Sequence, residues 1–402
     1  MQDVQPAGVT GALHYATLPR AAPARVLACG ADLKNAACLI DGDRVIWSAP
    51  HGNLANHDNC DALRLAVTQL VDCASGPVHA VAHDLHPDFY SSRVAQVIAA
   101  RLGVPAIAVQ HHHAHIAVAQ AEQGIEGGVI GLALDGVGLG SDGMPWGGEI
   151  LWVDAAREAQ HWQRLAHLAL LESPGGDNAL LEPWRMAAAA LHGLGRGHEI
   201  AARFGASVGL PKAQHVQGIL HSKSNCPRSS SGGRWFDAAA AALGLVLRQT
   251  FEAEAAIRLE QYATAWLATR PDFDVVWDSL DLLPLMSQLF ALPTADASEH
   301  YEDARGAGAA LFHVALANGL AHHAIAAARS HAVQTVVLGG GCFLNQILCA
   351  RLRVKLGHAG LAVVQPGSVS CCDAGIALGQ AWIAACTIHP SRGVQPAKAS
   401  AH

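Results

Sequence analysis

Two histidines, His111 and His115, stand four positions apart in a segment that holds four imidazoles within five residues. Residues at this spacing lie on one face of an α-helix, so both imidazoles can bind the same metal ion. The preceding segment, 102–109, is predicted to be a short buried strand, and open α/β sheets build their sites where strand ends lead into helices. A histidine-rich helix start that only meets solvent is the structural alternative.

Two aspartates are candidates for the same ligand set. Asp135 ends a predicted buried strand before a glycine-rich turn, and Asp373 stands at a predicted helix start. An aspartate at a helix start is more commonly an N-cap, but its carboxylate can also bind a metal. Two histidines with one or two aspartates form a mixed nitrogen and oxygen set that suits iron, zinc or manganese. The histidine pair lacks the glutamate of the H-E-x-x-H pattern, which disfavours a metalloprotease.

A run of three glycines, Gly339 to Gly341, joins a predicted strand to a predicted helix start. Glycines let backbone amides approach a phosphate, and a helix N-terminus adds about half a positive charge. The run matches neither the P-loop nor the G-x-G-x-x-G pattern, and the glycines could serve only a tight turn. Asn345 is placed for a nucleotide contact or for a plain helix hydrogen bond.

The elements that must position these residues form a repeated pattern. Predicted strands at 25–30, 36–40 and 44–47 include a hairpin whose turn is Asp41-Gly42-Asp43. About a hundred residues later, a strand at 129–134, a glycine-rich turn ending at Gly148 and a strand at 149–153 repeat the arrangement. By analogy, two such lobes indicate the actin/hexokinase type of nucleotide-binding fold.

The remaining segments complete the predicted domain organisation. Alanine-rich helical patterns dominate residues 180–330, interrupted by a polar loop at 222–233 that we interpret as a site loop. We expect a flexible leader at 1–24, lobe I at 25–128, and lobe II at 129–385 with a helical insertion at about 180–330. A flexible tail is expected at 386–402.

Composition limits the classes of function. Of 402 residues, 51% are hydrophobic and 15% charged, with a formal net charge of -7, so we expect a globular protein without a nucleic-acid-binding surface. The ten cysteines include no C-x-x-C pair, and the N-terminus lacks a signal-peptide pattern. These features predict reduced thiols, a cytoplasmic location and no membrane partner.

Eight blocks in order carry a resemblance to a known family. They are 31–35, 84–88, 109–115, 135–149, 174–186, 230–237, 340–345 and 373–380. Together they resemble the C-terminal carbamoyltransferase domain of the HypF family of [NiFe]-hydrogenase maturation proteins, over residues 25 to 385. Asp-Leu-His-Pro-Asp at 84–88 and Glu-Pro-Trp-Arg-Met at 182–186 point to HypF rather than to the related tRNA threonylcarbamoyl transferase TsaD.

The resemblance implies an α/β, bilobal actin/hexokinase-like (ASKHA) fold with two RNase H-like lobes and a helical insertion. It also implies one metal ion, iron or zinc, and an ATP- or AMP-type nucleotide such as carbamoyl adenylate. The metal ligands would be His111, His115, Asp135 and Asp373. The nucleotide would be held by Gly340, Gly341, Asn345 and Glu252, and the catalytic cations would be Lys34, Arg185 and Arg234.

The implied reaction is transfer of a carbamoyl group from carbamoyl adenylate to the C-terminal cysteine of HypE. Full-length HypF proteins also carry acylphosphatase, zinc-finger and YrdC-like domains. We expect this chain to be a natural short form without them or an excised domain, which depends on a separate protein for carbamoyl adenylate. One departure is Ala253, which replaces a glycine of the family pattern. A TsaD-like transferase and a non-catalytic nucleotide- and metal-binding partner of HypE are the alternatives.

Overall fold

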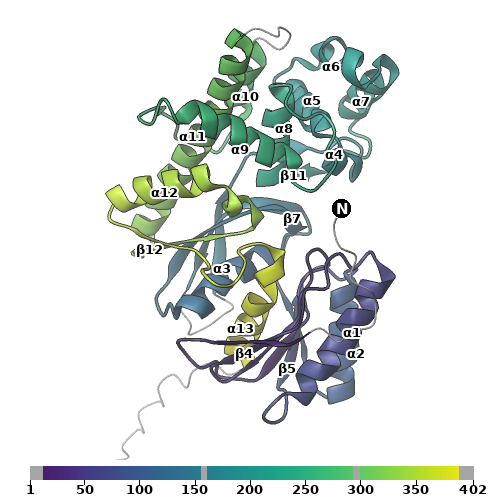
Figure 1. The fold of residues 1–402 in the computed structure, drawn as a ribbon, viewed down its shortest axis with the longest axis vertical. Helices are drawn as coiled ribbons and strands as arrows, with labels where there is room; N and C mark the ends of the chain where they lie inside the picture. The colour runs from purple at the N-terminus through teal and green to yellow at the C-terminus, as the bar shows by residue number, and fades with distance from the viewer. Residues whose placement is uncertain (1–11, 155–160, 293–298, 389–402) are drawn as a thin grey trace, which may run out of the picture. The chain divides into compact units, whose positions relative to one another are not determined.

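The computed structural model describes residues 12–154, 161–292 and 299–388, which divide into two compact units (Figure 1). The first unit comprises Met1–Val129, Trp152–Gln163 and Gln365–His402. The second comprises Ile130–Leu151 and Arg164–Val364.

A six-stranded sheet forms the centre of the first unit, in the order β1-β4-β3-β2-β5-β6. The strands are β1 (His14–Thr17), β2 (Val26–Ala28), β3 (Cys38–Asp41), β4 (Arg44–Trp47), β5 (Ala80–Asp84) and β6 (Ala106–Val109). β2, β3 and β4 are antiparallel neighbours, whereas β5 runs parallel to β2 and β6 parallel to β5. The predicted hairpin is confirmed, because Asp41 pairs with Arg44 across the turn.

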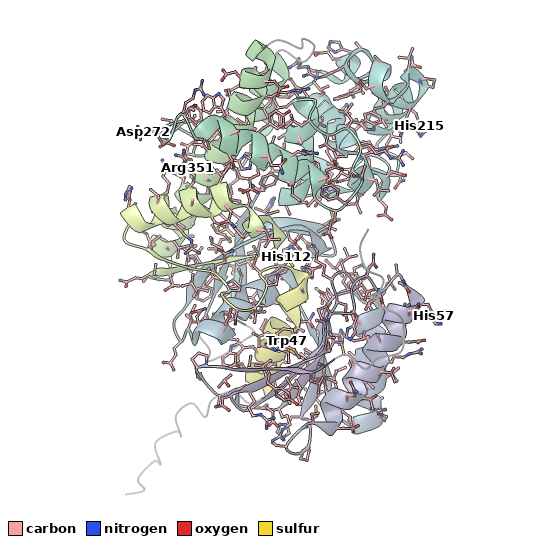
Figure 2. The ribbon with its side chains drawn as sticks, in the orientation of Figure 1. Trp47, His57, His112, His215, Asp272 and Arg351 are labelled. Carbon is pink, nitrogen blue, oxygen red and sulfur yellow. The ribbon has the colours of Figure 1, made fainter. Side chains whose placement is uncertain are left out.

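Four helices cover this sheet, two on each face. Helices α1 (His57–Asp72) and α2 (Tyr90–Leu102) pack on one face, and α3 (His111–Gln123) and α13 (Ile376–Ile388) on the other. Side chains alternate along a strand, so Leu27 packs toward α1 and α2 while Val26 and Ala28 pack toward α3 and α13. Trp47, at the end of β4, belongs to the core between the sheet and helices α3 and α13 (Figure 2).

Helices α3 and α13 approach each other very closely because Gly379 has no side chain. A Cβ at this position would lie 2.8 Å from the carbonyl carbon of Ala114 and 3.1 Å from the backbone nitrogen of Val118. This packing places α13 in the first unit, and the predicted boundary, which assigned residues up to 385 to lobe II, is therefore wrong. The contact joins segments more than 250 residues apart, which a local pattern does not reveal.

Three further expectations for the first unit are corrected. The predicted leader contains strand β1, and Leu18, Ala22 and Ala24 are buried in the core beneath it. The strand before the histidines is at the sheet edge, so Ala106 and Ala108 are exposed rather than buried. Helix α13 continues into the predicted tail as far as its last residue, Ile388. Residues 1–11 and 389–402 lie outside the described part of the chain.

The second unit contains a five-stranded sheet in the order β13-β12-β7-β8-β9. Its strands are β7 (Val129–Leu139), β8 (Pro145–Val153), β9 (Trp162–His167), β12 (Thr335–Gly339) and β13 (Ala362–Val364). β12 runs parallel to both β7 and β13. In each unit one strand, β2 or β7, therefore has its two hairpin strands on one side and two later parallel strands on the other, and β1 adds an edge strand to the first sheet. This repeated order confirms the predicted pair of RNase H-like lobes.

Helices make up most of the rest of the second unit. They are α4 (Asn178–Leu181), α5 (Pro183–Gly193), α6 (Ile200–Val208), α7 (Leu210–Ser222), α8 (Gly232–Ala242), α9 (Glu254–Leu267), α10 (Leu283–Ala291), α11 (Glu299–Ser330) and α12 (Gln346–His358). Three short 3-10 turns, η1 (Gly197–Glu199), η2 (Gly341–Leu344) and η3 (Asp373–Gly375), and the two-residue strands β10 (Leu171–Glu172) and β11 (Arg228–Ser229) complete the chain. The predicted alanine-rich helical insertion is confirmed.

Helix α11 is the longest and is part of a buried core. Its stretch Glu302–Ser330 is long and apolar enough to cross a membrane, with a mean hydropathy of 1.2, yet 72% of its apolar window is buried. Such burial is typical of a core helix. Phe312 on α11 packs edge-on against Phe236 of α8, and Trp184 and Trp235 are buried in the same unit.

Candidate functional site

Helix α3 begins at the histidine run, as predicted. Gln110 caps it, because its side-chain oxygen accepts a hydrogen bond from the backbone N–H of His113 at 2.7 Å. His111 and His115 are one turn apart and buried, with ring centroids 4.8 Å apart and ring planes at 82°. His112 lies on the same helix and contacts Gln110 through its Nδ1 atom at 3.0 Å (Figure 2). The alternative of a solvent-facing histidine cluster is therefore wrong.

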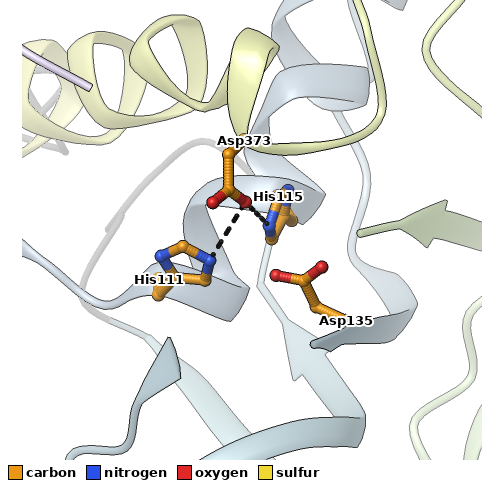
Figure 3. A group of neighbouring side chains, drawn as sticks. All are labelled: His111, His115, Asp135 and Asp373. Atoms are coloured by element: carbon orange, nitrogen blue, oxygen red, sulfur yellow. Dashed lines mark ion pairs between the residues drawn. The ribbon is translucent and has the colours of Figure 1, made fainter. Parts of the chain in front are cut away.

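Asp373 brings a carboxylate to this histidine pair within the first unit. Its Oδ1 atom is 3.5 Å from His111 Nε2 and 3.4 Å from His115 Nε2 (Figure 3). One ligand atom from each of the three residues lies within 4.8 Å of the others. Two imidazole nitrogens and one carboxylate oxygen fit a borderline divalent metal such as zinc or iron. The structure thus brings together three of the four predicted metal ligands in one unit.

A second carboxylate, that of Asp84, contacts His111 at its other ring nitrogen, Nδ1. Asp84, the last residue of β5, is completely buried, and its Oδ2 accepts a hydrogen bond from His111 Nδ1 at 2.7 Å. Its Oδ1 accepts the backbone N–H of His86 at 2.9 Å. Asp84 belongs to one of the family blocks, but no role was predicted for it from the sequence. The signal that could have found it was its position at the end of a buried strand next to the histidine strand.

The segment that carries Asp373 is tied to the far end of α3. Glu122 accepts hydrogen bonds from the backbone N–H groups of Gly367, Ser368 and Val369 at 2.8, 2.5 and 3.1 Å, and from the Ser368 hydroxyl. Burial raises the pKa of Glu122, but these hydrogen bonds outweigh it and hold the pKa below its usual value. One helix therefore carries two predicted ligands and also anchors the loop before the third.

Asp135, the fourth predicted ligand, lies on β7 in the second unit. Its Oδ1 accepts a hydrogen bond from the backbone N–H of Gly341 at 3.1 Å. Its backbone carbonyl and that of Gly136 accept hydrogen bonds from the Ser231 hydroxyl. Ser231 is also the N-cap of α8, so the predicted polar site loop holds the middle of β7. A role for Asp135 as a metal ligand stays a prediction.

The glycine turn follows β12 as predicted and packs closely against β7. A nucleotide contact of Gly340 and Gly341 stays a prediction. Gly340 has φ +101°, and a Cβ there would lie 2.7 Å from the carbonyl carbon and 3.1 Å from the nitrogen of Leu134 on β7. The N–H of Gly341 is bonded to Asp135. A side chain at Gly340 would therefore meet the backbone of β7, whether or not a nucleotide is bound.

Asn345 has the structural role that we weighed against nucleotide binding. It is the N-cap of α12, and its Oδ1 accepts the N–H of Leu348 at 2.9 Å. Its Nδ2 donates to Nε2 of the buried His313 at 2.9 Å, while His313 Nδ1 donates to the carbonyl of Ala309 at 2.7 Å. Burial lowers the pKa of His313 to about 4, so the imidazole is neutral near pH 7 and can accept this bond. A nucleotide contact of Asn345 stays a prediction.

The two predicted catalytic arginines are held in ion pairs of the second unit. Arg185 on α5 is buried and pairs through Nε with Glu182 at 2.5 Å, and Glu182 also pairs with Lys212. Arg234 on α8 pairs with Asp237 at 2.9 Å. Burial raises the pKa of Asp237 to about 6, against the opposing effect of Arg234. These pairs fix both guanidinium groups, and a contact with substrate stays a prediction for each.

Lys34 and Glu252, the other two predicted site residues, are exposed. Lys34 has φ 47° in the loop after β2, next to the buried Asn35, whose amide nitrogen bonds the carbonyls of Cys29 and Ala31 at 2.8 and 2.5 Å. Glu252 lies in the turn before α9. The site roles predicted for both residues stay predictions.

Ala253, where the family pattern has glycine, is the N-cap of α9 with φ 60°. This left-handed conformation favours glycine, so the substitution leaves the backbone path intact at a cost in strain.

A buried network around Glu149 was also not predicted from the sequence. Glu149 on β8 is completely buried and accepts the backbone N–H groups of Gly147 and Gly148 at 2.9 and 3.0 Å. It also accepts the Ser230 hydroxyl at 2.5 Å and Arg164 Nε at 2.6 Å. The signal was a charged residue at the start of an otherwise apolar strand. The network fixes the Ser230–Ser231 loop, which holds β7 at Asp135 and Gly136.

Comparison with known proteins agrees with this geometry. Residues 21–122 match the family model described as HypF Kae1-like domain, and residues 131–380 match the one described as carbamoyltransferase, Kae1-like domain, second subdomain. The chain belongs to the HypF carbamoyltransferase family. The expected resemblance is confirmed, and with it membership of a transferase family. Both models are described for HypF or carbamoyltransferases, which favours this family over the TsaD-like alternative.

Similar HypF proteins differ in how much of their length the chain matches. The carbamoyltransferase HypF homolog of Cupriavidus necator is 56% identical over 377 residues, which cover 92% of this chain and 94% of that relative. Carbamoyltransferase HypF2 of the same organism is 44% identical over 400 residues, which cover 91% of this chain and 47% of the relative. The chain therefore spans nearly all of one relative and about half of the other.

Two solved HypF structures share the fold. Full-length HypF in a phosphate- and nucleotide-bound form is 29% identical, with a TM-score of 0.78 over 93% of this chain and 48% of that one. HypF of T. kodakarensis is 28% identical, with a TM-score of 0.80 over 93% and 49%.

Proposed function

We propose that this chain transfers a carbamoyl group from carbamoyl adenylate to the C-terminal cysteine of HypE. The observation that carries the proposal is the group formed by the buried His111 and His115 with the partly exposed Asp373, in a chain of the HypF family. A metal ion held there would supply Lewis-acid chemistry, polarising a carbamoyl or phosphate oxygen. Iron and zinc are the proposed ions.

The chain's residues prepare this group for binding. His111 contacts the buried Asp84 through Nδ1 at 2.7 Å, while its other nitrogen, Nε2, is the atom near Asp373. Glu122 and the contact at Gly379 fix the segment that carries Asp373 relative to α3. These contacts hold the donor atoms near one another, which would lower the ordering cost of binding an ion.

The proposed reaction is an acyl transfer. The HypE thiolate attacks the carbamoyl carbon, a C–S bond forms, and the C–O bond to the adenylate phosphate breaks. AMP leaves with the bond electrons, and the thiol proton goes to solvent. The nucleotide would bind at the turn of Gly340 and Gly341. The support for a nucleotide is that a solved HypF relative is described as phosphate- and nucleotide-bound.

Intact-mass analysis of HypE tests the proposal. Incubation with the chain, the metal and carbamoyl adenylate should add one carbamoyl group, and HypE with its C-terminal cysteine replaced by alanine should remain unmodified. His115→Ala should abolish transfer, whereas His57→Ala, at an exposed histidine of the first unit, should not. Unmodified HypE in the complete reaction would overturn the proposal and favour a non-catalytic binding partner.

The source of carbamoyl adenylate can be tested in the same assay. We propose that these 402 residues carry transfer but not adenylate formation. Carbamoyl phosphate and ATP should then leave HypE unmodified when the chain acts alone. Efficient carbamoylation from these two compounds would place both reactions in this chain.

A further inference from the structure

The carboxylate of Asp84 lies where it can determine which ring nitrogen of His111 carries a proton. It is fully buried at the end of β5, and its Oδ2 lies 2.7 Å from Nδ1 of a histidine that is itself only 2% exposed. Its other oxygen is taken by the backbone N–H of His86 at 2.9 Å. Both oxygens therefore have defined partners, and the carboxylate cannot rotate without losing one of them.

This contact fixes which nitrogen of His111 carries the proton. An ionised carboxylate only accepts hydrogen bonds, so the Nδ1 atom facing it must be protonated. The neutral ring then has its lone pair on Nε2. That atom is the one that lies 3.5 Å from Asp373 Oδ1, on the same side as His115 Nε2 (Figure 3). The tautomer that Asp84 selects is therefore the one that can bind a metal together with the other two residues.

We propose that Asp84 is a positioning residue for the metal centre, which holds His111 as an Nε2 ligand and strengthens it as a donor. The inference rests on the metal site of the proposed function and goes beyond it by assigning a residue that does not touch the metal. A carboxylate behind a ligating imidazole fixes the ring orientation and raises its basicity, and loss of such a partner typically lowers metal affinity about 10–100-fold.

The chain offers a matched control in the same segment. Asp88 lies four residues after Asp84 and is exposed, so Asp88→Asn makes the same change of charge without touching His111. Asp84→Asn keeps the shape of the side chain but replaces the carboxylate with an amide. An effect of general charge would appear in both variants, and an effect through His111 only in the first.

Titration of the metal-free full chain with Co²⁺, followed by its visible absorption, tests the inference. Wild type and Asp88→Asn should bind one ion per chain with equal affinity, and Asp84→Asn should bind about 10–100-fold more weakly. In a His111→Ala background, Asp84→Asn should have no further effect on affinity. Equal affinity of Asp84→Asn and wild type, or an undiminished effect in the His111→Ala background, would overturn the inference. Absence of Co²⁺ binding to wild type would instead overturn the metal site itself.

A second measurement keeps the inference testable if Asp84→Asn does not fold. Nitrogen NMR of the His111 ring in the metal-free wild-type chain reports the tautomer directly. We expect the proton on Nδ1 and an unprotonated Nε2. A proton on Nε2 with a bare Nδ1 would contradict the role of Asp84, whatever the stability of the variant.

Discussion

Replacement of Gly340 by alanine should destabilise the second unit strongly. The residue has φ +101° and ψ 157°, a region that is essentially restricted to glycine and costs other residues roughly 1–3 kcal/mol. In addition, the new Cβ would lie 2.7 Å from the carbonyl carbon of Leu134, so β7 or the turn must shift. Overpacking of this kind costs about 1–3 kcal/mol. The two effects sum to roughly 2–6 kcal/mol, a large part of the roughly 5–15 kcal/mol that holds a domain together.

Two other glycines of this unit separate the effects. Gly360 has φ +79° and no atom within 4 Å of the position that a Cβ would take, so Gly360→Ala imposes strain without a contact. Gly357, within α12, has equal space and no unusual φ, so Gly357→Ala should stabilise by up to about 1 kcal/mol. Urea unfolding should therefore rank the variants, with Gly340→Ala the least stable and Gly360→Ala between it and wild type.

The comparison between Gly340→Ala and Gly360→Ala decides whether contact with β7 adds to the backbone strain at Gly340. Equal unfolding midpoints would refute the argument that β7 excludes a side chain at Gly340. Calorimetric titration with ATP gives an independent reading of the same variant. If Gly340→Ala kept its stability and lost only nucleotide affinity, the glycine would serve the ligand and not the packing of the turn against β7.

Three further predictions concern the metal, a strained cap and an acid-sensitive anchor. His111→Ala and His115→Ala should each lower the metal content measured by elemental analysis from one ion per chain, because the remaining donors hold a borderline metal poorly; full occupancy in the double variant would contradict this. Ala253→Gly should raise the free energy of unfolding in urea by roughly 0.5–1 kcal/mol. It relieves left-handed strain of about 1–2 kcal/mol but increases the entropy of the unfolded chain, which costs about 0.4–1 kcal/mol. A destabilised variant would exclude strain at this cap. The lowered pKa of Glu122 stabilises the folded chain above pH 4.5, its ordinary value, and this stability is lost as pH falls through the folded-state pKa. Wild type should therefore be more stable than Glu122→Gln near neutral pH, and the difference in unfolding free energy should disappear in acid. If that difference did not depend on pH, hydrogen-bond geometry and not charge would be responsible.

The residue types and local spacing predicted much of the site. The four-residue interval between His111 and His115 fixed their common helical face before any fold was known. The turn after Asp41 and the strand–glycine–helix order around Gly340 were likewise local patterns and are confirmed. Each of these features depends only on residues that are close together in the sequence.

Features that depend on distant segments were not predictable in this way. The membership of α13 in the first unit depends on Gly379 meeting Ala114, and the exposure of β6 depends on its place at the sheet edge. The same holds for Asp84, since its contact with His111 joins residues 27 positions apart through two neighbouring strands. Arg185 could be recognised as a family cation, but its engagement by Glu182 depends on the conformation of the α4–α5 junction.

The close passage of α3 and α13 at Gly379 has a consequence for the proposed metal site. One helix supplies both imidazoles, and the other follows directly from the turn that carries Asp373, so their backbone contact sets the spacing of the donors. Polypeptide packing alone makes this contact. For the proposed ion, we expect the packing of these helices to hold the donor atoms together. A zinc finger differs, because its chain folds only around its metal. We therefore expect the proposed ion to be loaded after folding and removed without unfolding the chain.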